Sequence, residues 1–155
     1  PDSTGYDIAP EVMLKLAREF SNIVGCKDTI PGVAHTREII KMVKPVRPDF
    51  KVYSGFDDNF AYNVISGGDG CIGGIPGFFK EWMDAFKEND LQKISEKQQA
   101  VNRLMDIYGV GVPFVPYIKT AMAALGIIDS DKATFPLPKA TKEDVEKLLE
   151  ILNRK

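Results

Sequence analysis

The sequence has little of the residue types that build metal sites and disulfide scaffolds. Its 155 residues include two cysteines, Cys26 and Cys71, and one histidine, His35. Two thiols are too few for a disulfide framework, and a low cysteine content is typical of a reducing cytoplasm, which is the location we expect. No histidine, cysteine and carboxylate residues have the spacing of metal ligands, so we expect no metal centre.

The sequence also lacks a large excess of charge and a long apolar run. A formal net charge of −2 and a pI near 5.5 give no electrostatic basis for binding nucleic acid or an anionic membrane. No stretch approaches the ~18–20 apolar residues that a membrane-spanning helix needs. Residues 1–5 have neither the basic start nor the apolar core of a signal peptide. We therefore expect a soluble protein without nucleic-acid or membrane partners.

Helix-type and strand-type patterns alternate in the first half of the chain. The predicted helices cover residues 7–20, 33–43 and 57–65, and the predicted strands cover residues 23–27, 50–55 and 71–75. Val12, Ala17 and Phe20 share one face of the first helix, which we expect to be buried. The later patterns are all helical, over residues 78–86, 90–108, 114–125 and 143–153, with a proline-containing linker over 134–139. Thr141 and Asp144 are typical of a capping box at the start of the last helix.

This alternation predicts an α/β fold with a parallel sheet. The hydrophobic fraction of 44% is sufficient for one domain with a core of its own. Three parallel strands alone make a poor sheet, because both of its edges remain open. We therefore interpret the chain as the C-terminal portion of a larger α/β barrel.

Lys27 is the strongest candidate for a catalytic residue. It ends a short apolar run, residues 23–27, which is predicted to be a strand. α/β barrels place their chemistry at the C-terminal ends of such strands, and a neutral amine held there can attack a ketone and form a Schiff base. A free lysine has a pKa near 10.4, and burial lowers that value. The alternative is a lysine that reaches solvent or pairs with Asp28.

Glycine and acidic residues follow the second predicted strand. Gly55 would let a ligand approach the backbone closely, and Asp57 and Asp58 could accept hydrogen bonds from substrate hydroxyls. The alternative is that the two acids begin a helix, where they interact favourably with its dipole. The glycines of residues 67–74 lack the Lys-Ser/Thr of a phosphate-binding loop, so a tight turn is the better interpretation. His35 is expected to lie on the surface or to cap its helix.

Several motifs together resemble one known family. They are Pro1-x-x-Thr4-Gly5, Gly25-Cys26-Lys27-Asp28-Thr29, Tyr53-Ser54-Gly55-x-Asp57 and Gly68-Asp69-Gly70-x-Ile72-Gly73. In order and spacing, over essentially the whole chain, they resemble the dihydrodipicolinate synthase/N-acetylneuraminate lyase family. The resemblance implies a (β/α)8 TIM barrel that forms a homotetramer. It also implies that Lys27 forms a Schiff base with pyruvate or another 2-oxo acid, without any further cofactor.

The resemblance implies substrate-binding roles for five other residues. Thr29 would neighbour the bound substrate, while Gly55 and Asp57 would meet its variable, aldehyde-derived part. Ile72 and Gly74 would form the wall beside the last strand.

The resemblance also implies a place for each part of the chain. The three predicted strands become strands six, seven and eight of the barrel. Residues 1–88 would form the βα units, and residues 89–155 would form a C-terminal helical extension of the same domain. The family's proton-shuttling tyrosine lies three positions before the proline that Pro1 matches, and therefore outside this chain. We accordingly expect the missing N-terminal half of the barrel to be a partner of this chain. The sequence also departs from the family at Pro76-Gly77, which replaces an asparagine-containing segment.

Details of the sequence are most similar to the 2-keto-3-deoxy-gluconate aldolase subgroup. The synthases carry an arginine where Ser3 stands, so a guanidinium for a substrate carboxylate is missing. Residues 27–36 and 112–115 look more like those of the aldolases. We therefore expect a class I aldolase, a lyase that joins or splits pyruvate and an aldehyde, acting on a 2-keto-3-deoxy sugar acid. Dihydrodipicolinate synthase activity, N-acetylneuraminate lyase activity and a non-catalytic half-barrel remnant remain open alternatives.

Overall fold

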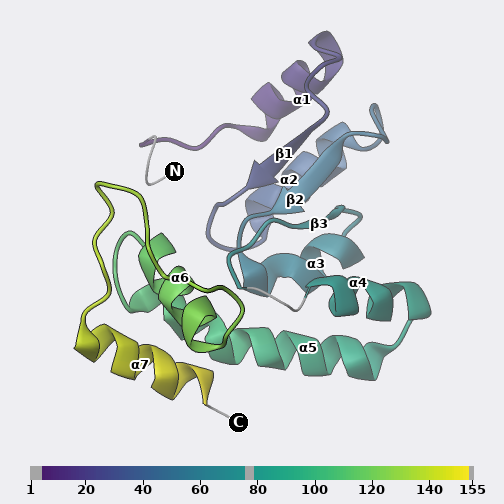
Figure 1. Ribbon diagram of the computed structural model, residues 1–155. Helices are drawn as coiled ribbons and strands as arrows, with labels where there is room; N and C mark the ends of the chain where they lie inside the picture. Colours follow the sequence, from purple (N-terminus) through teal and green to yellow (C-terminus); the bar gives the residue numbers. More distant parts are fainter. Residues whose placement is uncertain (1–4, 76–78, 154–155) are drawn as a thin grey trace. The chain divides into compact units, whose positions relative to one another are not determined.

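The computed structural model describes residues 5–75 and 79–153 of the chain (Figure 1). The chain divides into two compact units, Pro1–Gly73 and Gly74–Lys155. The first unit holds the sheet and the second is helical. In the described parts of the chain, no helix has the length and apolar character to cross a membrane.

The first unit alternates helices and strands, as the sequence predicts. Its elements are α1 (Pro10–Glu19), β1 (Gly25–Asp28), α2 (Ala34–Val43), β2 (Lys51–Ser54), a 3-10 turn η1 (Asp57–Asn59), α3 (Phe60–Ile65) and β3 (Gly70–Cys71). The strands are all parallel and lie in the order β1-β2-β3. Each new strand is added on the same side of the previous one, which is the order found in a segment of a singly wound barrel.

The core of the first unit lies between the sheet and the two helices α1 and α2. Its buried side chains are Met13 and Ala17 of α1, Ile39, Ile40 and Val43 of α2, and Phe50 and Val52 at β2. The predicted face of the first helix is only partly right. Val12 and Phe20 are 47% and 48% exposed, and Met13 takes the buried position instead.

Arg47 holds the end of α1 and the segment that leads into β1. Its Nη1 donates to the carbonyl oxygens of Ala17 and Ile23, each at 2.8 Å, and to that of Phe20 at 3.2 Å. Its Nη2 donates to the Ser21 carbonyl at 3.1 Å. The last carbonyls of a helix have no partner within the helix, so one guanidinium satisfies groups that would otherwise need water.

We predict that Arg47→Ala lowers the free energy of unfolding of the complete protein by about 2 kcal/mol, because hydrogen bonds from a charged donor to four carbonyls are lost. Chemical denaturation measures this change. Arg37→Ala is the matched control, because Arg37 lies on the exposed surface beside Glu38 and its loss should leave the midpoint unchanged. Equal midpoints for both variants would contradict the role given to Arg47.

The third strand is shorter than the sequence predicts. The prediction covers residues 71–75, whereas β3 contains only Gly70 and Cys71. The Ile72 amide still donates to the Ser54 carbonyl at 2.8 Å. Beyond it, the backbone of Gly73 packs on the side chain of Asp57, so closely that a Cβ on Gly73 would lie 2.0 Å from Oδ1. This packing takes the chain out of the sheet after two residues.

In the described residues of the second unit, the regular secondary structure is all helical, as predicted. It contains α4 (Phe79–Glu88), α5 (Leu91–Leu104), a 3-10 turn η2 (Met105–Gly109), α6 (Val115–Ala124) and α7 (Lys142–Leu152). The helix predicted over residues 90–108 is therefore divided, with its last turn tightened to 3-10 geometry. The capping box at the start of α7 is confirmed, because Thr141 and Asp144 exchange side-chain and backbone hydrogen bonds. Leu148 and Ile151 of α7 pack with α6 in a core of their own.

Candidate active site

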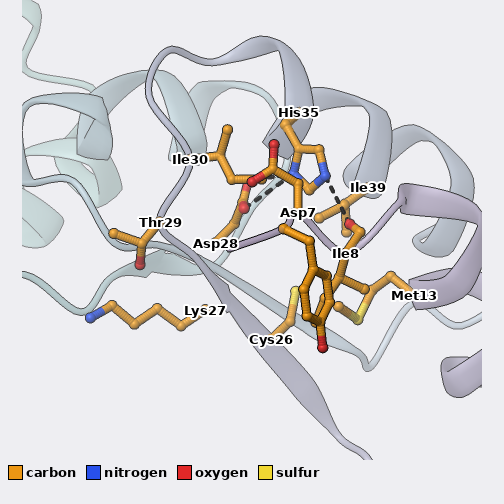
Figure 2. A pocket seen from close by; sticks show the side chains of 11 residues that line it. Asp7, Ile8, Met13, Cys26, Lys27, Asp28, Thr29, Ile30, His35 and Ile39 are labelled. Carbon is orange, nitrogen blue, oxygen red and sulfur yellow. Dashed lines mark hydrogen bonds and ion pairs between the residues drawn. The ribbon is translucent and has the colours of Figure 1, made fainter. Parts of the chain in front are cut away.

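Lys27 lies near the C-terminal end of β1, opposite Tyr53 of β2. Side chains alternate between the two faces of a strand, so Lys27 and Asp28 leave on opposite faces. Lys27 is exposed, and its ammonium forms no hydrogen bond or ion pair with any residue that the structure describes. Figure 2 shows the Lys27 side chain extending away from Asp28 and His35. Lys27 thus does not pair with Asp28, but it does reach solvent, as the alternative expects, and the burial expected from the apolar strand is absent in the described structure.

Gly55 and Thr29 lie beside the Lys27 side chain. The Gly55 amide donates to the Asp28 carbonyl at 2.7 Å, which continues the pairing of β1 with β2 past the end of β2. A Cβ on Gly55 would lie 1.9 Å from Thr29 Oγ1 and 2.9 Å from Lys27 Cε. Only glycine permits this approach. The structure thus brings together three of the residues that the sequence singles out.

The other predicted site residues are placed in different ways. Asp57 is fully buried and begins η1, as the helix-start alternative expects. Ile72 follows β3 and is 49% exposed. Gly74 belongs to the second unit, where its amide donates to Tyr108 Oη at 2.9 Å.

Some positions used in the sequence argument lie outside the described residues. These are Pro1, Ser3 and Thr4 of the first motif and the Pro76-Gly77 segment.

The two cysteines are poor nucleophiles. Burial raises the pKa of the Cys71 thiol to about 12, and the nearby Asp57 carboxylate adds to the rise. Burial also raises the pKa of the Cys26 thiol to about 12, with a further contribution from Asp28. A thiol reacts as its thiolate, so neither cysteine is a reactive nucleophile near neutral pH. Among the described residues, no group of three or more histidine, cysteine and acidic side chains could hold a metal ion.

A cluster around Asp28 was not predicted from the sequence. His35 Nδ1 lies 3.1 Å from both carboxylate oxygens of Asp28, and Thr36 Oγ1 donates to the same carboxylate. His35 Nε2 lies 2.9 Å from the Ile8 carbonyl oxygen. His35 is therefore a bonded residue, neither free on the surface nor a helix cap. The sequence signal that could have indicated this cluster is Asp28 at the end of a strand, followed by His35 and Thr36 in the first turn of the next helix.

The sequence comparison assigns the chain to a family. Residues 1–155, the whole chain, match the dihydrodipicolinate synthetase family. The chain belongs to this family, and the resemblance stated from the motifs is confirmed.

Two relatives from Escherichia coli K12 are named as sugar-acid aldolases. The "Probable 2-dehydro-3-deoxy-D-pentonate aldolase YjhH" is 37% identical over 152 residues, which are 96% of this chain and 50% of the relative. YagE, whose name gives 2-dehydro-3-deoxy-D-gluconate aldolase as the proposed activity, is 34% identical over 93% of this chain and 48% of its own length. The chain thus spans about half the length of the curated relatives it matches.

Solved structures of the family match the fold. A crystal structure of YagE in complex with pyruvate superposes with a TM-score of 0.93 at 32% identity, over 98% of this chain and 52% of that one. Dihydrodipicolinate synthase from Thermotoga maritima superposes with a TM-score of 0.84 at 29% identity, over 96% and 51% of the two chains.

We predict that Gly55→Ala displaces the Thr29 side chain and lowers stability by roughly 1–3 kcal/mol, because the added methyl group has no room. A crystal structure of the variant shows the displacement, and denaturation measures the loss. Gly109→Ala is the control, because a Cβ at Gly109 meets no atom within 4 Å. An unmoved Thr29 in a variant of full stability would contradict the close approach.

Proposed function

We propose that this chain supplies the catalytic lysine of a class I aldolase, a lyase that splits a 2-keto-3-deoxy sugar acid into pyruvate and an aldehyde. The observation that carries the proposal is the exposed amine of Lys27, without an ion-pair partner in the described structure, beside Gly55 and Thr29 at the end of a parallel strand. The names of YjhH and YagE support the sugar-acid substrate. The pyruvate in the YagE crystal structure supports the 2-oxo acid.

In the proposed reaction, the neutral amine of Lys27 attacks the ketone carbon of the 2-oxo acid. Loss of water gives an iminium ion. The substrate hydroxyl next to the breaking C–C bond then gives its proton to the tyrosine expected on the missing part of the barrel. The electron pair of that C–C bond passes to the iminium ion, which becomes an enamine, and the aldehyde leaves. The enamine takes a proton at carbon, and water then hydrolyses the iminium ion to release pyruvate and the free lysine. The covalent bond to substrate takes the place of a cofactor.

Neighbouring residues would hold the substrate. We propose that Thr29, whose hydroxyl lies beside Gly55, contacts the bound 2-oxo acid, and that Gly55 leaves room for it. Ile72 and Gly74 are proposed to form the wall for the aldehyde-derived part. Asp57 is proposed to support the aldehyde-derived part of the substrate as well. Because Asp57 is buried against Gly73, this contribution would be indirect, through the shape of the chain that follows β3.

The proposed enzyme needs more of the barrel than this chain contains. The described sheet has three strands, and the face that carries Lys27 is exposed. We propose that β1, β2 and β3 are strands six, seven and eight, that residues 1–88 form the βα units, and that residues 89–155 form the helical extension. The remaining strands would close the barrel over Lys27 and supply the proton-shuttling tyrosine. A homotetramer in the cytoplasm is proposed on the family resemblance.

The first test is covalent trapping. The complete protein, incubated with pyruvate and borohydride, should gain one reduced pyruvate adduct, and peptide mapping should place it on Lys27. Lys27→Arg should give no adduct, because a guanidinium remains protonated. Lys51→Arg is the matched control, because Lys51 lies on the neighbouring strand and pairs with Asp69. An adduct on Lys51 or Lys119 would refute the assignment.

The second test concerns completion of the barrel. Residues 1–155 expressed alone should show no sugar-acid cleavage, because open parallel edges and a one-sided core favour association over a formed site. Co-expression with the N-terminal half should restore cleavage, and size-exclusion chromatography should show the two halves together. A monomeric 155-residue chain that cleaves the substrate would contradict the half-barrel proposal. A soluble, completed barrel without trapping or cleavage would favour the non-catalytic remnant.

A further inference from the structure

The ring of His35 lies between two hydrogen-bond acceptors. Nδ1 faces the Asp28 carboxylate at 3.1 Å, and Nε2 faces the Ile8 carbonyl at 2.9 Å (Figure 2). A carbonyl oxygen can only accept, and a neutral imidazole has a single N–H to donate. Thr36 donates its hydroxyl to Asp28. Both ring contacts are satisfied when Nε2 carries a proton and one further proton lies between Nδ1 and the Asp28 carboxyl group.

The Asp28 contacts join three parts of the first unit. Ile8 lies before α1, Asp28 ends β1, and His35 is in the first turn of α2. The side chains of Asp28 and His35 are only 5% and 19% exposed, so water screens this pair weakly. The Asp28 carbonyl, in turn, accepts the Gly55 amide. Asp28 is thus fixed by its side chain on the covered face of the sheet and by its backbone beside Gly55.

We propose that His35, hydrogen-bonded to both Asp28 and Ile8, is a positioning residue for Lys27. The proposal rests on the proposed function, since it concerns the same lysine. His35 does not contact the reacting atoms. It fixes Asp28, and the residues on either side of Asp28 are Lys27 and Thr29, whose side chains meet beside Gly55. A loose Asp28 would let the amine and the Thr29 hydroxyl shift together relative to the substrate.

Other ionisable groups also border the ring. The ring borders a hollow of about 210 Å³ that is also lined by Tyr6, Asp7, Cys26 and Lys27. Asp7 adds a second carboxylate to this hollow. Burial raises the pKa of the Cys26 thiol to about 12, so the thiol is uncharged, and Lys27 extends away from the ring (Figure 2).

The first experiment measures ring protonation and does not depend on catalysis. In the complete protein labelled with ¹⁵N-histidine, the His35 signals are assigned by their loss in His35→Gln. We expect Nε2 to carry a proton and the Nδ1 signal to move in Asp28→Asn, because these atoms contact Ile8 and Asp28. An unprotonated Nε2, or an Nδ1 signal that Asp28→Asn leaves in place, would overturn the proposal, whether or not the protein is an aldolase.

The second experiment compares the rates of pyruvate trapping for three variants. His35→Gln should lower the maximal rate about tenfold and leave the half-saturating pyruvate concentration within roughly twofold, because a small misplacement of a reacting group slows the reaction more than it weakens binding. His35→Arg keeps more than one hydrogen-bond donor, and should recover most of the rate. Lys41→Gln, on the exposed side of α2, should match the wild type.

The split between rate and binding separates positioning from a merely structural role. His35→Gln as fast as the wild type would overturn the proposal. Absence of trapping in the wild type would refute the aldolase function and leave the ring measurement to decide the contacts of His35.

Discussion

Strand β1 pairs with β2 so that Lys27 lies opposite Tyr53 and Asp28 lies opposite Ser54. The rest of the site depends on this register, because a shift by one residue would exchange the two faces of β1. The observed register sends Lys27 to the exposed face and Asp28 to the face that α1 and α2 cover. It also brings Gly55 to the Asp28 carbonyl, where its missing side chain leaves room for Lys27 and Thr29.

The parts of this arrangement that the sequence predicts are those decided by local pattern. An apolar run that ends in Lys27 identifies both a strand and its functional end. A glycine directly after the next strand identifies Gly55 as a place of close approach. Successive parallel strands place their C-terminal ends at one edge of the sheet, so the proximity of Lys27 and Gly55 can be predicted even when no contact is known. Helix starts that depend on neighbouring residues, such as the capping box of Thr141 and Asp144, were predictable for the same reason.

Features that depend on distant residues were not predictable. The first helix buries Met13 and exposes Val12, because the rotation of a helix is set by the surface it packs on and not by its own periodicity alone. Strand β3 ends early because Gly73 meets Asp57, sixteen positions before it in the sequence. The bond between Asp28 and His35 crosses a loop whose path the sequence pattern does not give. In each case the deciding partner lies in another element.

The burial of the two thiols has a practical consequence for chemical modification. With a pKa of about 12 for both Cys26 and Cys71, roughly one thiol in 10⁵ is a thiolate at pH 7. Maleimides and disulfide reagents attack the thiolate, so both cysteines should react slowly while the fold is intact. A single cysteine introduced on the exposed side of α2 would therefore accept a fluorophore or spin label selectively, with both native cysteines left in place.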